Sequence, residues 1–185
     1  AGYDRSFDRM IPRELWQAGP KRRRRESTAV FADIEIDWGQ ATVRLPSEMR
    51  IDLGGIAKGA FVDSVMHLFG GVPGALVDTG GDLAIRGIAP DGDIWRVGVQ
   101  HPGNPAADLT QLTIPGGTAF GVATSSARVR SWRTTSGRAC HLIEPRTGQP
   151  IEQEAPGLTV VADTVTQAEI ETKSILLSII RGEIP

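Results

Sequence analysis

Short runs in which apolar and polar residues alternate fill much of this chain and predict strands. FADIEIDW (31–38) alternates in this way, and ATVRLP (41–46) follows after Gly39-Gln40, a pattern that predicts a β-hairpin. Further short apolar runs, each bounded by Gly, Pro or Asp, predict strands at 74–81, 82–87, 94–100, 108–114, 120–126, 139–145 and 158–163. Many short strands of this kind are typical of a largely antiparallel sheet.

Two segments have helical spacing instead. Apolar residues recur at intervals of three and four across residues 56–69, and Gly70-Gly71 ends the run. Residues 166–180 predict a closing helix with Thr166 as its N-cap and Glu169 at its third position. No repeat or linker divides the chain, so we expect one α+β domain over residues 1–185, with helices packed on the sheet.

Composition and charge exclude several classes of protein. The 185 residues are 40% hydrophobic and 23% charged, as in an ordinary globular chain, and 22 Gly with 12 Pro argue against a helical bundle. The net charge of −2 gives no reason to expect nucleic acid or an anionic membrane as partner. No apolar run is long enough for a transmembrane helix. The basic run KRRRRE (21–26) predicts a solvated loop or, alternatively, a phosphate contact.

The signatures of common enzyme classes are missing. The chain has no GxGxxG after a strand, no GxxxxGK[ST], no HExxH and no GxSxG. Its single cysteine, Cys140, excludes an intrachain disulfide, and Cys140-His141 is a weak metal pair without further soft ligands. His67 lies in an apolar helical pattern and is interpreted as a surface or core residue.

Polar and glycine-rich loops remain as candidate chemistry. Gly54-Gly55 precede the first predicted helix, where backbone amides favour phosphate. Lys58 falls in the first turn of that helix, where its charge opposes the helix dipole, and this predicts a nearby anion. Two other loops have either a binding role or a plain turn role; their residues are Asp78, Gly80, Gly81 and Asp82, and Thr124, Ser125 and Ser126.

Two more positions carry alternatives. His141 precedes a PRTG turn, as a phosphate contact or a proton carrier. Glu169 and Lys173 are four residues apart on one helix face, which predicts either an exposed ion pair or a Glu169 oxygen ligand for a hard cation such as Mg²⁺.

The order of these segments resembles the ApbE family, the FAD:protein FMN transferases formerly called thiamine-biosynthesis lipoproteins. DLGGIAKG (52–59), GGD (80–82), WRVGVQHP (95–102), ATSS (123–126), CHLIEPRTGQP (140–150) and TVVAD…AEIETK (159–173) occur in the family's order, and GYDRSFD (2–8) resembles the segment that precedes them. The resemblance implies an α+β fold and Mg²⁺-dependent transfer of FMN from FAD to a Thr or Ser hydroxyl of an acceptor protein, with release of AMP.

The resemblance also implies roles for single residues. It places Asp52, Lys58, Gly80, Gly81, His141 and Ile143 at the flavin nucleotide, with Lys58 and His141 as the catalytic pair. It implies a metal bound by the Gly55 carbonyl and the Glu169 carboxylate, with the Thr172 hydroxyl beside them. Attack on a diphosphate needs positive charge, which Mg²⁺ and Lys58 would supply, and a base for the hydroxyl proton, which is either His141 or a carboxylate near the metal.

The sequence departs from the family pattern in three ways. Lys173 stands where the family has a Thr metal ligand, so its ammonium could replace the Mg²⁺, and Glu169 and Glu144 replace Asp. The family's amino-terminal portion is missing, so we expect a fragment whose site another segment or chain completes. Many members of the family are exported and some are cytoplasmic, and the sequence favours neither compartment for this chain. Three other functions stay open: a flavin-binding module, an FAD pyrophosphatase, and a remnant that binds nothing.

Overall fold

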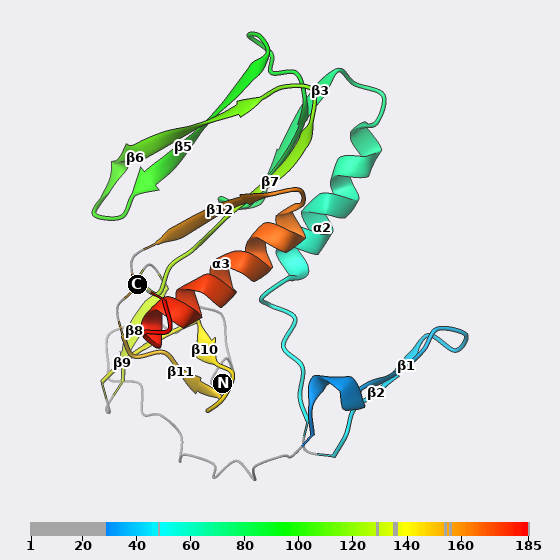
Figure 1. The fold of residues 1–185 in the computed structure, drawn as a ribbon, viewed down its shortest axis with the longest axis vertical. Helices are drawn as coiled ribbons and strands as arrows, with labels where there is room; N and C mark the ends of the chain where they lie inside the picture. Colours follow the sequence, from blue (N-terminus) through cyan, green and yellow to red (C-terminus); the bar gives the residue numbers. More distant parts are fainter. Residues whose placement is uncertain are drawn as a thin grey trace.

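The computed structural model describes residues 29–47, 49–128, 130–134, 137–153, 155 and 157–184 (Figure 1). The basic run at 21–26 and the segment 2–8 lie outside the described residues, as does the start of the predicted 1–185 domain. The domain boundary and the role of the basic run therefore stay predictions.

A four-stranded antiparallel sheet is the largest sheet among the described residues. Its strand order is β12-β7-β4-β3, and every neighbouring pair is antiparallel. The strands are β3 (Gly74–Asp78), β4 (Leu83–Gly87), β7 (Ala119–Ser125) and β12 (Leu158–Ala162). Together with the two helices described next, this sheet confirms the predicted α+β class with a largely antiparallel sheet.

The two helices pack on each other and on this sheet (Figure 1). Helix α2 (Ala57–Met66) continues into the 3₁₀ helix η2 (His67–Phe69), and α3 (Val165–Ile180) closes the chain. Their backbones approach closely at Gly59, where a Cβ atom would lie 2.8 Å from the Thr166 backbone. Only glycine fits this crossing without a shift. Within the described residues, neither helix is both long and apolar enough to span a membrane.

Four two-stranded hairpins and a short 3₁₀ helix complete the structure. The 3₁₀ helix is η1 (Phe31–Asp33), and the hairpins pair β1 (Glu35–Asp37) with β2 (Thr42–Arg44), β5 (Ile94–His101) with β6 (Asn104–Pro115), β8 (Ser131–Thr134) with β9 (Gly137–Cys140), and β10 (Ile143–Glu144) with β11 (Gln149–Pro150). The predicted hairpin near the amino-terminal end is confirmed, and it extends away from the sheet (Figure 1). The strand predicted at 139–145 is two strands, because the chain turns at His141 and Leu142.

The predicted N-cap of the closing helix is wrong. Thr164 is the N-cap, and its hydroxyl accepts a hydrogen bond from the Gln167 amide at 3.1 Å. Thr166 lies inside the helix, and its hydroxyl donates to Asp63 of α2 at 2.6 Å. The Thr166 hydroxyl therefore binds Asp63 of α2 and does not cap α3.

Candidate functional site

The candidate site is built around Glu169, an acidic side chain buried between α2 and α3. Only 1% of this residue is exposed. Its Oε2 accepts a hydrogen bond from the Gly59 amide of α2 at 2.8 Å, so the close helix crossing holds the carboxylate in place. A carboxylate removed from water needs hydrogen bonds and opposite charge around it.

Two lysines supply that charge at the other carboxylate oxygen. The Lys173 Nζ lies 3.3 Å from Glu169 Oε1 and donates to the Glu169 backbone carbonyl at 3.1 Å. The Lys58 Nζ lies 3.5 Å from the same Oε1 atom. The alternative of an exposed Glu169–Lys173 pair is wrong, because the pair exists but its carboxylate is buried.

A second buried carboxylate, that of Asp82, also contacts Lys58. Asp82 is 3% exposed, and its Oδ2 forms an ion pair with the Lys58 Nζ. Asp82 follows Gly80 and Gly81, whose φ angles of 72° and 96° favour glycine. The Gly81 amide donates to Asp78 Oδ1 at 2.8 Å, which closes this turn. We call Lys58, Asp82, Glu169 and Lys173 the two-lysine cluster.

The electrostatics of the cluster extend to His141. Burial lowers the pKa of the His141 imidazole, a hydrogen bond to the Arg130 carbonyl opposes this, and the charges of Arg130, Lys173 and Lys58 lower the pKa further. His141 Nδ1 lies 3.3 Å from the Arg130 carbonyl oxygen. A carbonyl only accepts, so this contact places a proton on Nδ1. The lowered pKa favours the neutral ring, in which Nε2 is the proton-accepting nitrogen.

Lys58 is perturbed in the same way. Burial is the main cause that lowers the pKa of its ammonium, and the Glu169 carboxylate partly offsets that effect. The charges of Lys173 and Arg130 lower the pKa further. The anion predicted from the position of Lys58 at the start of α2 is therefore supplied within the protein, by Glu169 and Asp82.

Two buried hydroxyls lie behind the cluster. The Thr172 hydroxyl donates to the Glu169 carbonyl at 3.0 Å, so the Ser125 hydroxyl at 2.9 Å donates to the Thr172 oxygen. Ser125 and Thr124 belong to β7, which contradicts the turn alternative for both. The Ser126 hydroxyl accepts from the Arg128 amide at 3.1 Å, as expected of a turn residue.

The other predicted residues lie at different distances from the cluster. Gly55 adjoins it, because a Cβ atom there would lie 3.7 Å from Lys173 Cδ. Asp52 is exposed in the loop before α2, where its Oδ1 accepts from the Gly54 amide at 2.8 Å. Ile143 is half-buried in β10, opposite Pro150 of β11. The flavin contacts assigned to Asp52, Ile143, Gly80 and Gly81 stay predictions.

The residues expected to hold Mg²⁺ are engaged by other protein groups. Both oxygens of Glu169 already have partners, one an amide and the other two ammonium groups. The Thr172 hydroxyl has two hydrogen bonds. Among the described residues, no group of three or more His, Cys, Asp or Glu side chains is arranged for a metal. As arranged, the site does not fit a magnesium ion.

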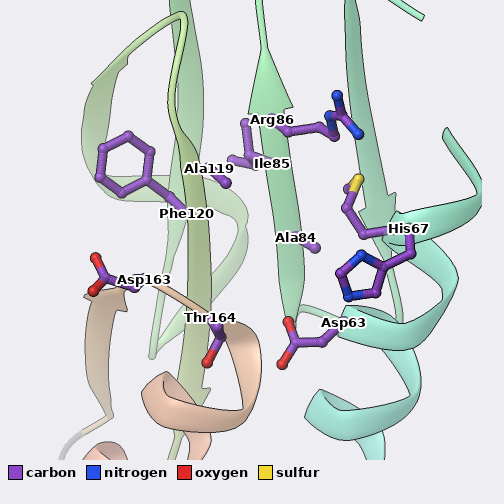
Figure 2. Close-up of a pocket in the computed structure, with 10 residues that line it drawn as sticks. Asp63, His67, Ala84, Ile85, Arg86, Ala119, Phe120, Asp163 and Thr164 are labelled. Atoms are coloured by element: carbon purple, nitrogen blue, oxygen red, sulfur yellow. The ribbon is translucent and has the colours of Figure 1, made fainter. Parts of the chain in front are cut away.

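A separate hollow of about 270 Å³ lies between α2, the sheet and the start of α3 (Figure 2). Its lining residues are Asp63, Met66, His67, Ala84, Ile85, Arg86, Ala119, Phe120, Asp163 and Thr164. His67 is exposed there, which confirms its interpretation as a surface residue. None of the residues predicted to bind flavin or metal lines this hollow.

The sequence patterns do not identify two residues that contact Lys58 or Glu169. Asp82 is expected only as one member of a glycine-rich loop with a binding or a turn role, and Gly59 is not among the candidate residues. A glycine inside an apolar helical pattern is a usable signal for Gly59, because it marks either a close approach or a cap. The pairing of Asp82 with Lys58 has no local signal in the sequence, because the two residues are 24 positions apart and the rest of α2, η2 and β3 lie between them.

The fold and the cluster define an α+β protein with buried carboxylates paired to lysines at a helix crossing. The ApbE family matches residues 7–179, and the chain belongs to this family. A Vibrio cholerae protein named FAD:protein FMN transferase is 27% identical over 169 residues, covering 84% of this chain and 49% of the relative. The Salmonella typhimurium protein of the same name is 30% identical over 124 residues, covering 66% of this chain and 35% of the relative.

Solved structures agree on the fold. The ApbE protein of Thermotoga maritima superposes with a TM-score of 0.70 at 25% identity, over 81% of this chain and 48% of its own. The flavinyl transferase ApbE of Pseudomonas stutzeri gives 0.61 at 26% identity, over 78% of this chain and 44% of its own. The chain thus spans about half the length of these proteins or less.

Proposed function

We propose that this chain takes part in the transfer of FMN from FAD to a Thr or Ser hydroxyl of an acceptor protein. The acceptor oxygen attacks the FMN phosphorus, the diphosphate bridge breaks, and AMP leaves with the bridging oxygen. Family membership supports this proposal, as do the names of the relatives. The observation that carries it is the two-lysine cluster, whose Lys58 and Lys173 charges help to lower the pKa of the His141 imidazole.

Each part of the cluster has a chemical role in this proposal. The ammonium groups of Lys58 and Lys173 neutralise the diphosphate, whose charge increases on the leaving AMP. His141 accepts the hydroxyl proton at Nε2, since its lowered pKa keeps the ring neutral near pH 7. Asp52, Gly80, Gly81 and Ile143 contact the flavin nucleotide. The expected Mg²⁺ would add the same kind of charge. Of its predicted ligands, however, Glu169 and Thr172 already have hydrogen-bond partners within the protein, and Gly55 adjoins Lys173.

The test incubates the chain with FAD and a candidate acceptor protein and measures covalent flavin and AMP in the same tubes. We expect Lys58→Met and His141→Asn each to lower covalent flavin about 100-fold, because charge stabilisation and base catalysis contribute factors of this size. Arg96→Met, an exposed charge in the β5–β6 hairpin, is the matched control and should match the wild type.

The same assay separates the alternatives. AMP without covalent flavin would indicate an FAD pyrophosphatase, in which water replaces the acceptor hydroxyl. Saturable FAD binding without AMP would indicate a flavin-binding module. Wild-type rates in both the Lys58 and His141 variants would contradict the assigned roles, and no FAD binding at all would contradict the proposed function.

A further inference from the structure

The charges of the two-lysine cluster balance without a metal. Two buried carboxylates, Asp82 and Glu169, face two ammonium groups, Lys58 and Lys173. Two ammonium groups carry the same total charge as one divalent cation. The electrostatic requirement that a metal would satisfy at these carboxylates is therefore already met by the protein.

The geometry leaves little room for a cation at Glu169. Magnesium binds oxygen at roughly 2.0–2.1 Å and requires nearly octahedral coordination. The Glu169 Oε1 atom has the Lys173 Nζ at 3.3 Å and the Lys58 Nζ at 3.5 Å, while Oε2 accepts from the Gly59 amide at 2.8 Å. A metal bound to Oε1 would lie beside two like charges, which opposes its binding.

Exposure decides which groups a ligand meets. The side chains of Lys58 and Lys173 are 43% and 25% exposed, whereas those of Asp82 and Glu169 are 4% and 2% exposed. An ammonium has three N–H donors, and each lysine uses two of them on the acceptors described above. One donor of each lysine therefore remains for an anion that arrives from solvent.

We infer that the Lys58 and Lys173 ammonium groups take the place of a divalent cation here, so that this cluster binds a diphosphate group without a metal. The identity of the ligand as FAD rests on the proposed function, but the metal independence of the cluster does not. Replacing Lys173 removes one positive charge, leaves Glu169 with the Lys58 ammonium alone, and should open the cluster to Mg²⁺.

The experiment compares the wild type, Lys173→Thr and Lys173→Met, with Arg96→Met as a control that removes one exposed positive charge elsewhere. Each purified chain is treated with EDTA and then measured with and without an excess of MgCl₂. The first readout is the melting temperature with Mg²⁺ alone. The second is FAD affinity, from the change in flavin fluorescence. Lys173→Met keeps the apolar stem, so it guards against a Thr variant that fails to fold.

For the wild type and Arg96→Met, we expect Mg²⁺ to leave the melting temperature unchanged and to change FAD affinity by less than about twofold. For the Lys173 variants, we expect about tenfold weaker FAD binding in EDTA, as for loss of one charge-assisted contact, and recovery with Mg²⁺. Mg²⁺ should also raise their melting temperatures by about 2–4 °C.

Two results would overturn the inference. One is a wild type that binds FAD tenfold more weakly in EDTA than in Mg²⁺. The other is a saturable Mg²⁺ stabilisation of the wild type as large as that of the Lys173 variants. If no chain binds FAD, the proposed function fails, while the melting temperatures with Mg²⁺ alone still decide between the lysine pair and a metal.

Discussion

The amino-terminal end of α3 depends on a side chain from α2. Asp63 accepts three hydrogen bonds there: from the Val165 amide at 2.9 Å, the Thr166 amide at 2.9 Å and the Thr166 hydroxyl at 2.6 Å. Its negative charge also lies at the positive end of the helix dipole. Because α3 carries Glu169 and Lys173, we predict that Asp63→Ala weakens both the fold and the site.

The size of the effect follows from those three contacts. A hydrogen bond to a charged group contributes about 1.5–3 kcal/mol, but the freed helix amides regain part of this from water. Asp63 lines the hollow (Figure 2) and is only half-buried, so water can reach these amides. We therefore expect Asp63→Ala to lower the free energy of unfolding by about 2–3 kcal/mol. Asp63→Asn keeps one accepting oxygen without the charge and should lower it by about 1 kcal/mol.

Urea unfolding followed by circular dichroism measures this difference. Thr164→Ala is the matched control, because it removes only the local cap of the same helix and should cost about 1 kcal/mol. A value for Asp63→Ala no larger than that for Thr164→Ala would refute the view that the contact between the helices positions α3. FAD affinity of the Asp63 variant should fall along with its stability.

Two further changes test other parts of the structure. Gly121→Ala in β7 should lower the free energy of unfolding by about 3 kcal/mol, because a Cβ atom there would overlap the Thr164 backbone, whereas Gly71→Ala meets no atom and should change it little; urea unfolding compares the two. Glu144 accepts from Arg181 at 2.5 and 2.9 Å, and this contact, together with the hydrogen bond from the Arg146 amide, lowers the Glu144 pKa from 4.5 to about 2. The stability it adds is complete above about pH 4.5 and is lost as the pH falls towards 2, so thermal melts should show a wild-type advantage of a few degrees over Glu144→Gln at pH 6 that has disappeared at pH 2. A wild-type advantage that grows as the pH falls would contradict the predicted direction of this pH dependence.

Much of the fold could be predicted from the sequence, because its signals are local. Alternation and bounding glycines are properties of a few adjacent residues, and they located the strands of the main sheet and the hairpin at 35–44. The helix at 56–69 followed from apolar spacing in the same way. The prediction of Thr166 as the N-cap of α3 was wrong because Thr164 and Thr166 are equivalent in local sequence. Only Asp63, about 100 positions earlier, distinguishes them.

The candidate site was predictable only in part. Lys58 stood out because a positive charge at a helix start is unfavourable by itself, and the resemblance indicated Glu169. Which carboxylates compensate Lys58 depends on the turn at Gly80-Gly81 and on the helix crossing, both of which are tertiary. The exposed ion pair inferred from the spacing of Glu169 and Lys173 was wrong for the same reason. Spacing along a helix gives the shared face but not what covers that face.

The crossing at Gly59 connects the stability of the fold to its chemistry. Because Gly59 has no side chain, α2 can approach Thr166 closely. For the same reason the Gly59 amide can donate to Glu169 Oε2. With Oε2 held in this way, Oε1 is directed to the two ammonium groups, and the positions of Lys58 and Lys173 follow from the packing of the two helices. A cluster fixed by backbone packing needs no metal to assemble, which is the physical basis for expecting the lysines to meet a diphosphate directly.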